Sequence, residues 1–387
     1  MDYAGATPTR EEARLEMENA KPLFGNPGGL HKEAVAAASA LESARKDIAK
    51  VLGCRARSIV FTSGATESNN LAILGYAHSL QRSGEDISKT HWITSAIEHP
   101  SVLACFAHLK EIGAEVSYIQ PDEHGTINIE ALSKELKENT VFVSIGWANG
   151  EIGTIQPMHT LSQKIREHEK INKKQIVFHT DAGQAPLYEV STVQGLGVDL
   201  LSLDSGKLYG PRGVGVLYQR DEVSLDARII GGGQERGLRA GSENVIGAIG
   251  FARAIVCASD EREKETRRMK ELRNFFLREL QERIKGTVLN GTSKKQLPHI
   301  VNVSLPHISS EYFLLVLDHA GIALSTKSAC REGEEVESHV VRTLKGENWR
   351  ARQTLRFSFG MDTRMRDVLS VLKKVSKKYE QLRNIDN

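Results

Sequence analysis

Hydrophobic and polar residues follow one alternating pattern between about residues 36 and 250. Short β-branched and aromatic runs alternate with amphipathic stretches in which apolar residues recur at helical spacing. Such alternation is typical of an α/β fold, in which helices cover both faces of a mainly parallel sheet. The pattern predicts helices at residues 34–52 and 100–112, and strands at residues 58–62, 116–119, 141–145, 176–179, 200–203 and 214–218.

The pattern changes near residue 258. A run of mixed charges covers residues 260–268 and continues as an amphipathic helix to about residue 284. Mixed charges at helical spacing are typical of a solvated helix face and do not favour nucleic-acid binding. Beyond this helix the pattern predicts strands at residues 299–305 and 354–359, and helices at residues 310–320 and from residue 362.

A chain of 387 residues is long enough for two domains. We predict a large domain at residues 15–257, which binds a cofactor. A smaller α+β domain is expected to combine residues 1–14 with residues 258–387.

Composition narrows the classes of partner. The chain has 51 basic and 49 acidic residues, so no global field attracts it to nucleic acid or to an anionic membrane. We find no secretion signal and no apolar run long enough to span a bilayer. Four widely spaced cysteines, at 54, 105, 257 and 330, provide neither a C-x-x-C metal motif nor a dense disulfide framework. We therefore expect a cytoplasmic protein without a structural metal.

Three polar motifs follow predicted strands. Residues 62–70 link a strand to a helix, and Gly64, Ala65 and Thr66 there suit a phosphate cradle, although such a turn is commonly only a helix cap. Asp181 follows a strand and suits a protonated pyridine nitrogen, although it too is typical of a cap. Lys207 follows another strand and suits a Schiff-base amine. Their order, each at a strand end, favours a pyridoxal 5'-phosphate (PLP) site.

Cys330 lies in a polar stretch between Lys327 and Arg331. Neighbouring cations favour the thiolate, which is the nucleophilic form of cysteine, whereas several glutamates that follow oppose it. The other three cysteines lie in apolar or helical sequence and are expected to be small buried hydrophobes. A reactive thiol together with an amine for PLP indicates sulfur chemistry on an amino acid.

The chain resembles the cysteine desulfurases, PLP enzymes of the aminotransferase class V group, and fits their long-loop branch best. The likeness runs nearly from end to end and implies the fold type I of PLP-dependent transferases. The segments that carry it are residues 24–27, 62–70, 98–102, 149–153, 181–184, 207–215, 236–242, 328–330 and 355–358.

The resemblance implies a role for each residue around the cofactor ring. Lys207 would bind PLP covalently and later move the Cα proton. Asp181 would pair with the ring nitrogen, and Gln184 would reach the ring hydroxyl. Asn149 would bond near that hydroxyl or the substrate. His99 would stack on the ring and act as acid or base, since imidazole titrates in the useful range.

The resemblance also implies how phosphate, substrate and sulfur are handled. Thr66 would hold the phosphate with Ser242 of the partner subunit, so a homodimer is expected. Arg356, with Asn26, would bind the carboxylate of L-cysteine. Cys330 would take the sulfur as a persulfide, leave L-alanine, and pass the sulfur to an acceptor protein of iron–sulfur cluster assembly or tRNA thiolation.

Two positions before Lys207 depart from the family pattern. A histidine and a serine that contact the cofactor phosphate in the family are replaced by Gly206 and Asp204. Three interpretations stay open: Ser205 substitutes as donor, Asp204 points away, or the affinity for the phosphate is lower. An acid beside a phosphate is unfavourable. Two alternatives therefore stay open: a selenocysteine lyase or another class V aminotransferase-like enzyme, and a catalytically silent protein of this fold that acts as a binding partner.

Overall fold

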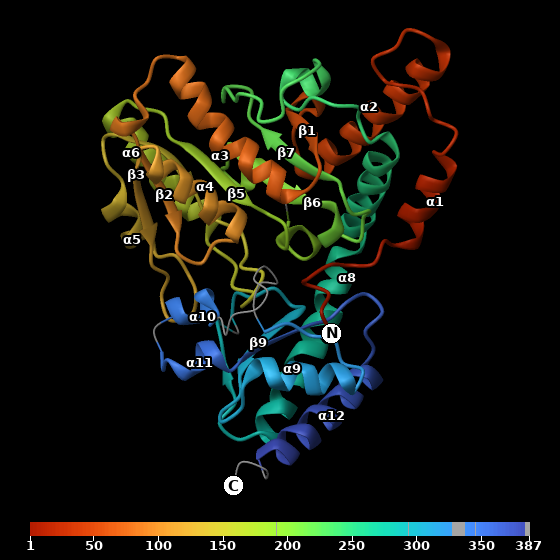
Figure 1. Ribbon diagram of the computed structural model, residues 1–387, viewed down its shortest axis with the longest axis vertical. Coiled ribbons are helices and arrows are strands. Elements are labelled where there is room, and N and C mark those ends of the chain that lie inside the picture. The colour runs from red at the N-terminus through yellow and green to blue at the C-terminus, as the bar shows by residue number, and fades with distance from the viewer. Residues whose placement is uncertain (191, 293, 327–336, 345, 384–387) are drawn as a thin grey trace.

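The computed structural model describes residues 1–383 except 191, 293, 327–336 and 345 (Figure 1). A seven-stranded sheet forms the upper part of the molecule, in the order β1-β7-β6-β5-β4-β2-β3. Strands β3, β2, β4, β5 and β6 run parallel to one another, whereas β7 runs antiparallel to both of its neighbours, β6 and β1. The strands are β1 (Ile59–Thr62), β2 (His91–Ser95), β3 (Glu115–Ile119), β4 (Thr140–Ser144), β5 (Val177–Asp181), β6 (Leu200–Asp204) and β7 (Gly215–Gln219).

Alternate residues of these strands bury two hydrophobic layers. On one face, residues such as Phe142 and Leu200 pack against α3 (Ala65–Arg82) and α4 (Pro100–Glu111). On the other face, residues such as Phe178 pack against helices that include α2 (Lys32–Leu52), α6 (Met158–Asn172) and α8 (Val245–Arg283). The predicted α/β class, with helices on both faces of a mainly parallel sheet, is therefore confirmed.

The remaining helices of the upper part are mostly short. The predicted helix at residues 34–52 corresponds to α2, and Gly53 ends it in the left-handed conformation with φ 66°. The helices are α1 (Glu11–Asn19), α2 (Lys32–Leu52), α5 (Ile129–Glu135), α6 (Met158–Asn172) and α7 (Val193–Leu196), with 3₁₀ turns η1 (Ala56–Ser58), η2 (Ile87–Lys89), η3 (Ala185–Leu187), η4 (Ser205–Lys207) and η5 (Gln234–Gly237).

A second, antiparallel sheet of three strands lies in the lower part, in the order β10-β9-β8 (Figure 1). Phe357 of this sheet contacts Phe276 of the long helix α8, with ring centroids 4.9 Å apart. The predicted strands and helices of this region are found within a few residues. They are β9 (Ile300–Ser304), β10 (Thr354–Ser358), α9 (Ser310–His319) and α12 (Met365–Arg383). The region also contains β8 (Val288–Leu289), α10 (His339–Thr343) and α11 (Trp349–Arg352), which were not predicted.

Helix α8 (Val245–Arg283) runs without a break from the upper to the lower part (Figure 1). The domain boundary expected at residue 257 falls inside this helix, and the charge run marks its more exposed stretch. The N-terminal segment also links both parts, because the Met1 carbonyl accepts from Ser358 N at 2.8 Å and Thr7 N donates to Gly206 O at 2.9 Å. The division into domains stays a prediction.

One inner strand of the large sheet, next to the edge strand β3, was not predicted. Strand β2 carries the buried His91, whose ring nitrogens contact the hydroxyls of Thr140 and Ser117 at 2.9 and 3.0 Å. A buried histidine that is satisfied by neighbouring strands interrupts the apolar pattern on which the prediction depended. In the described part of the chain, no helix has the length and apolar character needed to cross a membrane.

Candidate active site

The site lies at the carboxyl ends of the parallel strands β5 and β6, where ligands bind in open α/β sheets. Asp181 is the last residue of β5 and Asp204 the last residue of β6, and the two strands pair directly. Lys207 closes the 3₁₀ turn η4, which follows β6 at once. Two of the three predicted strand-end motifs therefore meet at one edge because adjacent parallel strands end there.

Lys207 is held by the first residues of the chain. Its Nζ donates to Ala4 O at 2.9 Å and to Gly5 O at 2.5 Å. Burial lowers the pKa of Lys207, and the nearby Arg356 cation lowers it further, against the opposing effect of Asp204 and other acids. A lower pKa increases the neutral fraction of the amine, which is the form that attacks a carbonyl.

Gln184 shares the same N-terminal segment. Its Nε2 donates to Ala4 O at 2.8 Å, so the side chains of Gln184 and Lys207 converge on one carbonyl oxygen. The structure thus brings these two predicted residues together and adds the backbone of residues 4 and 5 to the site. Sequence reasoning did not assign that backbone a role.

Asp181 is fixed by two donors. Its Oδ2 accepts from Asn69 Nδ2 at 2.8 Å, and its Oδ1 accepts from Gly183 N at 3.0 Å. Asn69 lies on the buried face of α3 and also donates to Ser101 Oγ at 2.9 Å. Asn69 lies within the motif at residues 62–70, but no role was predicted for it. The feature that could have revealed a role is a polar amide among the buried residues of helix α3.

His99 caps helix α4 and remains exposed. Its Nδ1 accepts from Ser101 N at 3.2 Å and contacts Ser101 Oγ at 2.8 Å. Surrounding protein atoms desolvate the ring enough to lower its pKa, although the charge of Asp181 opposes this. A neutral ring with Nδ1 engaged leaves Nε2 as the nitrogen that could exchange a proton with a ligand.

The residue before His99 is a buried acid that sequence reasoning did not assign. Glu98 Oε1 accepts from Ser95 Oγ at 2.6 Å, and both carboxyl oxygens lie 3.0 Å from Gly146 N. Desolvation raises the pKa of Glu98 to about 7 in spite of these hydrogen bonds, and the nearby Asp181 charge adds to the rise. Glu98 anchors the start of α4 to the strand end after β4.

Asn149 and Arg356 meet at one turn. The Asn149 side chain is bonded to protein: Nδ2 donates to Ile97 O at 2.8 Å, and Oδ1 accepts from Glu151 N at 2.9 Å. The carbonyl of the next residue, Gly150, accepts from Arg356 Nη1 at 2.9 Å. In this structure Asn149 therefore shapes the turn against which the arginine rests.

Arg356 comes from β10 of the lower sheet and is buried. Its Nη2 forms an ion pair with Asp2 Oδ1 at 2.8 Å, a contact that sequence reasoning missed. Its Nε is buried without a hydrogen-bond partner among the residues that the structure describes. A guanidinium with an unused donor suits a carboxylate ligand, which accepts two parallel hydrogen bonds from such an edge.

The predicted phosphate cradle is the start of helix α3. Gly64 precedes its first turn with φ 154°, and Thr66 in that turn is exposed. The first amide, Ala65 N, donates to Asp204 Oδ2 at 3.2 Å. Ser205 is fully buried, and a Cβ on Gly210 would lie only 2.1 Å from its Oγ, so the hydroxyl packs beneath that glycine.

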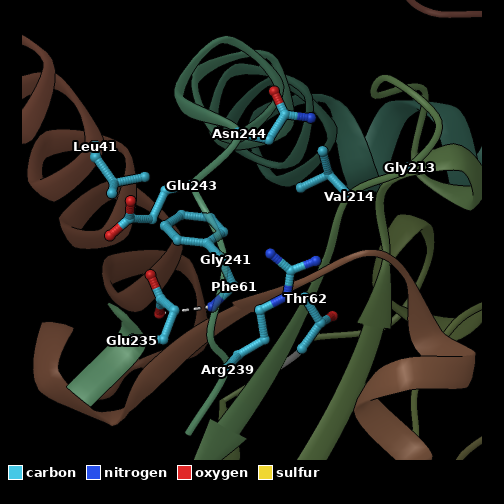
Figure 2. A pocket seen from close by; sticks show the side chains of 10 residues that line it. All are labelled: Leu41, Phe61, Thr62, Gly213, Val214, Glu235, Arg239, Gly241, Glu243 and Asn244. Atoms are coloured by element: carbon cyan, nitrogen blue, oxygen red, sulfur yellow. Dashed lines mark hydrogen bonds between the residues drawn. The ribbon is translucent and has the colours of Figure 1, made fainter. Parts of the chain in front are cut away.

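Ser242 and Asn26 stay on exposed loops of the single chain. The loop of Asn26, between α1 and α2, lies at the top right of Figure 1, away from η4. Figure 2 shows the pocket beside the loop of Ser242, with Arg239 next to Thr62. The structure does not bring Ser242 or Asn26 to Lys207 within one subunit.

A buried ion pair anchors that loop to the edge strand β1. Glu235 Oε1 accepts from Arg45 Nη2 at 2.8 Å, while Oε2 accepts from Phe61 N at 2.9 Å (Figure 2). Glu235 and Arg236 both adopt positive φ, 47° and 60°, which non-glycine residues rarely do. The ion pair between Arg45 and Glu235 holds this strained turn in place and so fixes the loop that carries Ser242.

The prediction for Cys330 lies outside the described residues, but the residues before and after that stretch reach the site. Ser325 pairs with Arg356, whose N donates to Ser325 O at 2.6 Å. His339 Nε2 contacts Glu98 O at 3.2 Å. Ser325 and His339, which flank that stretch, therefore contact Arg356 and Glu98 of the site.

The three described cysteines do not compete as nucleophiles. Cys105 and Cys257 are buried and Cys54 is half-buried. Desolvation raises the pKa of Cys54 and of Cys105 to about 12 and also raises that of Cys257. Within the described ranges, no group of three or more His, Cys, Asp or Glu side chains could hold a metal ion.

Comparisons with known proteins agree with this arrangement. The family model Aminotransferase class-V matches residues 1–371. "Cysteine desulfurase IscS" of Dictyoglomus turgidum is 40% identical over 386 residues, covering 100% of this chain and 95% of the relative. The solved structure "NIFS-LIKE PROTEIN" has a TM-score of 0.90 and 32% identity and covers 98% of each chain. A second, "SspA in complex with cysteine", has a TM-score of 0.78 and 32% identity and covers 92% of this chain and 97% of that one.

Proposed function

Because the chain belongs to the aminotransferase class-V family, we propose that it is a PLP-dependent cysteine desulfurase that converts L-cysteine to L-alanine and collects the sulfur on Cys330. The observation that carries the proposal is the convergence of Lys207, Asp181 and Arg356 from two sheets on one site. A relative that is 40% identical over its length and named a cysteine desulfurase supports the same activity.

The described residues fit the ring of PLP. Lys207 has a lowered pKa, and Asp181, which is held by two donors, would pair with the pyridinium nitrogen. Asn69 Oδ1 is buried without a hydrogen-bond partner among the described residues, so this amide is not yet fully satisfied. When bound, PLP draws electrons from the Cα of the substrate and makes neighbouring bonds breakable.

The chain's own residues would position L-cysteine and move its protons. Arg356 would hold the carboxylate through its Nε–H, which has no partner among the described residues, in exchange for part of its contact with Asp2. Lys207, as a neutral amine, would take the Cα proton. His99 Nε2 would deliver or accept a proton above the ring, because its Nδ1 is engaged by Ser101.

The sulfur step balances without an outside oxidant. The Cys330 thiolate attacks the substrate sulfur, an S–S bond forms and the substrate C–S bond breaks. The electron pair of that bond stays with the carbon skeleton, which takes up protons and leaves as L-alanine. Ser325, five residues before Cys330 in the sequence, pairs with Arg356, the residue proposed to bind the substrate carboxylate.

The site of a single chain leaves room for a homodimer. Ser242 and Asn26 are exposed, as are the large apolar side chains of Phe24, Leu30 and Ile230. We propose that Ser242 of the partner subunit completes the phosphate site, as the resemblance implies. The persulfide would pass to a cytoplasmic acceptor protein of iron–sulfur cluster assembly or tRNA thiolation.

Product analysis tests the proposal. Wild type and Cys330→Ser are incubated with L-cysteine and a reductant, and alanine and sulfide are measured. We expect both products from wild type and neither from Cys330→Ser. Equal alanine from both proteins would favour a selenocysteine lyase or another class V enzyme. No alanine from either would favour a silent binding protein, the alternative that Asp204 motivates.

Absorption spectra test the cofactor separately. Wild type should show a visible band with PLP that Lys207→Ala abolishes, because the lysine amine is the group that binds the aldehyde. Arg212→Ala, which removes an exposed cation five residues further on, serves as the control and should retain the band. A wild type that stays colourless with added PLP would contradict the proposal.

A further inference from the structure

Asp204 places a carboxylate at the start of helix α3, where the cofactor phosphate is expected. Its Oδ2 accepts from Ala65 N, the first amide of the helix, at 3.2 Å. Amides at a helix N-terminus and the helix dipole stabilise one anion there. In this chain part of that capacity is already used by the protein itself.

Two glycine turns enclose this carboxylate. A Cβ on Gly64 would lie 3.2 Å from Oδ2, and a Cβ on Gly206 would lie 3.2 Å from Oδ1. Gly215 of β7 pairs with Asp204, and a Cβ on Gly215 would lie 2.5 Å from the backbone of Gly64, so the start of β7 packs closely against the turn before α3. The side chain is therefore confined between the turns that precede α3 and Lys207.

Cations lie near this acid, since the Arg212 side chain packs against Gly206 beside it, but none of the described residues pairs with it. Lys207 and His99 are influenced by the charge of Asp204 through space, and the described part of the chain forms no ion pair with it. An unpaired carboxylate that shares a helix N-terminus with a phosphate dianion is repelled by it, and the repulsion is strong because the site is partly shielded from water.

We propose that Asp204 competes with the cofactor phosphate for the start of α3, so that this chain discriminates only weakly between PLP and unphosphorylated pyridoxal. The inference rests on the proposed PLP-dependent function and concerns how the cofactor is selected and retained. The cofactor is then held mainly through Lys207 and the ring contacts. Its phosphate contributes little.

Equilibrium dialysis of the apoprotein tests this without an activity measurement. Apparent Kd values for PLP and for pyridoxal are measured for wild type and Asp204→Asn. We expect PLP to bind at least tenfold more tightly to Asp204→Asn, while the Kd for pyridoxal stays within about twofold. The Kd for pyridoxal divided by the Kd for PLP therefore rises by at least about fivefold, and a tenfold change in Kd corresponds to about 1.4 kcal/mol.

Three further variants control for shape, fold and general charge. Asp204→Glu keeps the charge and should keep the wild-type ratio. Asp204→Ser keeps an acceptor for Ala65 N and should reproduce the gain if Asp204→Asn folds poorly. Asp2→Asn removes a negative charge on the Arg356 side of the site and should leave the ratio unchanged.

Two outcomes overturn the inference. An unchanged ratio in both Asp204→Asn and Asp204→Ser would mean that the carboxylate does not oppose the phosphate. If the ratio of the Kd values changes only because pyridoxal binds more weakly, Asp204 affects binding of the pyridine ring and not of the phosphate. If no variant binds either ligand, the proposed cofactor itself is wrong, which is a different result.

Discussion

Glu98 allows the pH dependence of folding stability to be predicted in sign and size. The carboxyl is buried beside His99, and desolvation raises its pKa from 4.5 to about 7. Between these two values the folded protein binds the Glu98 proton while the unfolded chain has released it. The free energy of unfolding therefore falls as pH rises through this window, because stability falls wherever the folded state binds more protons.

The magnitude follows from the two pKa values. At about 1.4 kcal/mol per pH unit, a rise from 4.5 to about 7 corresponds to about 3 kcal/mol of lost stability above pH 7. The contribution is fully present below pH 4.5 and is lost once the pH exceeds 7. Glu98→Gln has nearly the same shape but no charge to bury, so it avoids this loss.

Urea unfolding of wild type and Glu98→Gln at pH 5 and pH 8 measures the effect. The comparison is the stability of the variant minus that of wild type, which removes any pH-independent cost of the substitution. We expect this difference to move by about 2 kcal/mol or more in favour of the variant between pH 5 and pH 8. Glu123→Gln, at an exposed carboxyl, is the control and should give a flat difference. A flat difference for Glu98→Gln as well would refute the reasoning.

Three further substitutions test contacts around the site. Glu235→Ala leaves the buried Arg45 without its main partner and should lower the free energy of unfolding by about 3 to 5 kcal/mol, measured by urea unfolding. Asn69→Ala removes a hydrogen bond to the Asp181 carboxylate and should weaken PLP binding about tenfold in equilibrium dialysis. Arg356→Lys loses the forked donor and should raise the KM for L-cysteine about 10- to 100-fold with a smaller change in kcat, measured by alanine formation.

The position of the site at the carboxyl ends of the parallel strands could be predicted from the sequence, because it depends on the local pattern of apolar residues. Strands β5 and β6 are each marked by an apolar run, and adjacent parallel strands must end on one side, which brings Asp181 and Lys207 together. The neighbours of those residues depend on packing between distant segments. Asn69 reaches Asp181 because α3 crosses the sheet with that face inward, and no local pattern near either residue encodes the contact.

Composition reports exposure and not the path of the chain. The domain boundary predicted at residue 257 and the charge run at residues 260–268 both lie within α8, a continuous helix of 39 residues. Charges report which stretch of a helix meets water, and they contain no information on where the helix ends. Helical periodicity continued across the change in composition, and the start of α8 at Val245 lay upstream of it.

The electropositive features expected to bind ligands already contact internal acceptors. The carbonyls of Ala4 and Gly5 accept from Lys207, and Asp2 pairs with Arg356. At the start of α3, Asp204 accepts from Ala65 N. Ligand binding at such a site is an exchange of acceptors, so measured affinity reports the difference between the internal and the external one. Removing a donor should weaken binding, whereas removing the internal acid should strengthen it. Asp2→Asn should therefore lower the KM for L-cysteine while Arg356→Lys raises it, a pair of opposite signs that a purely structural role for Asp2 would not produce.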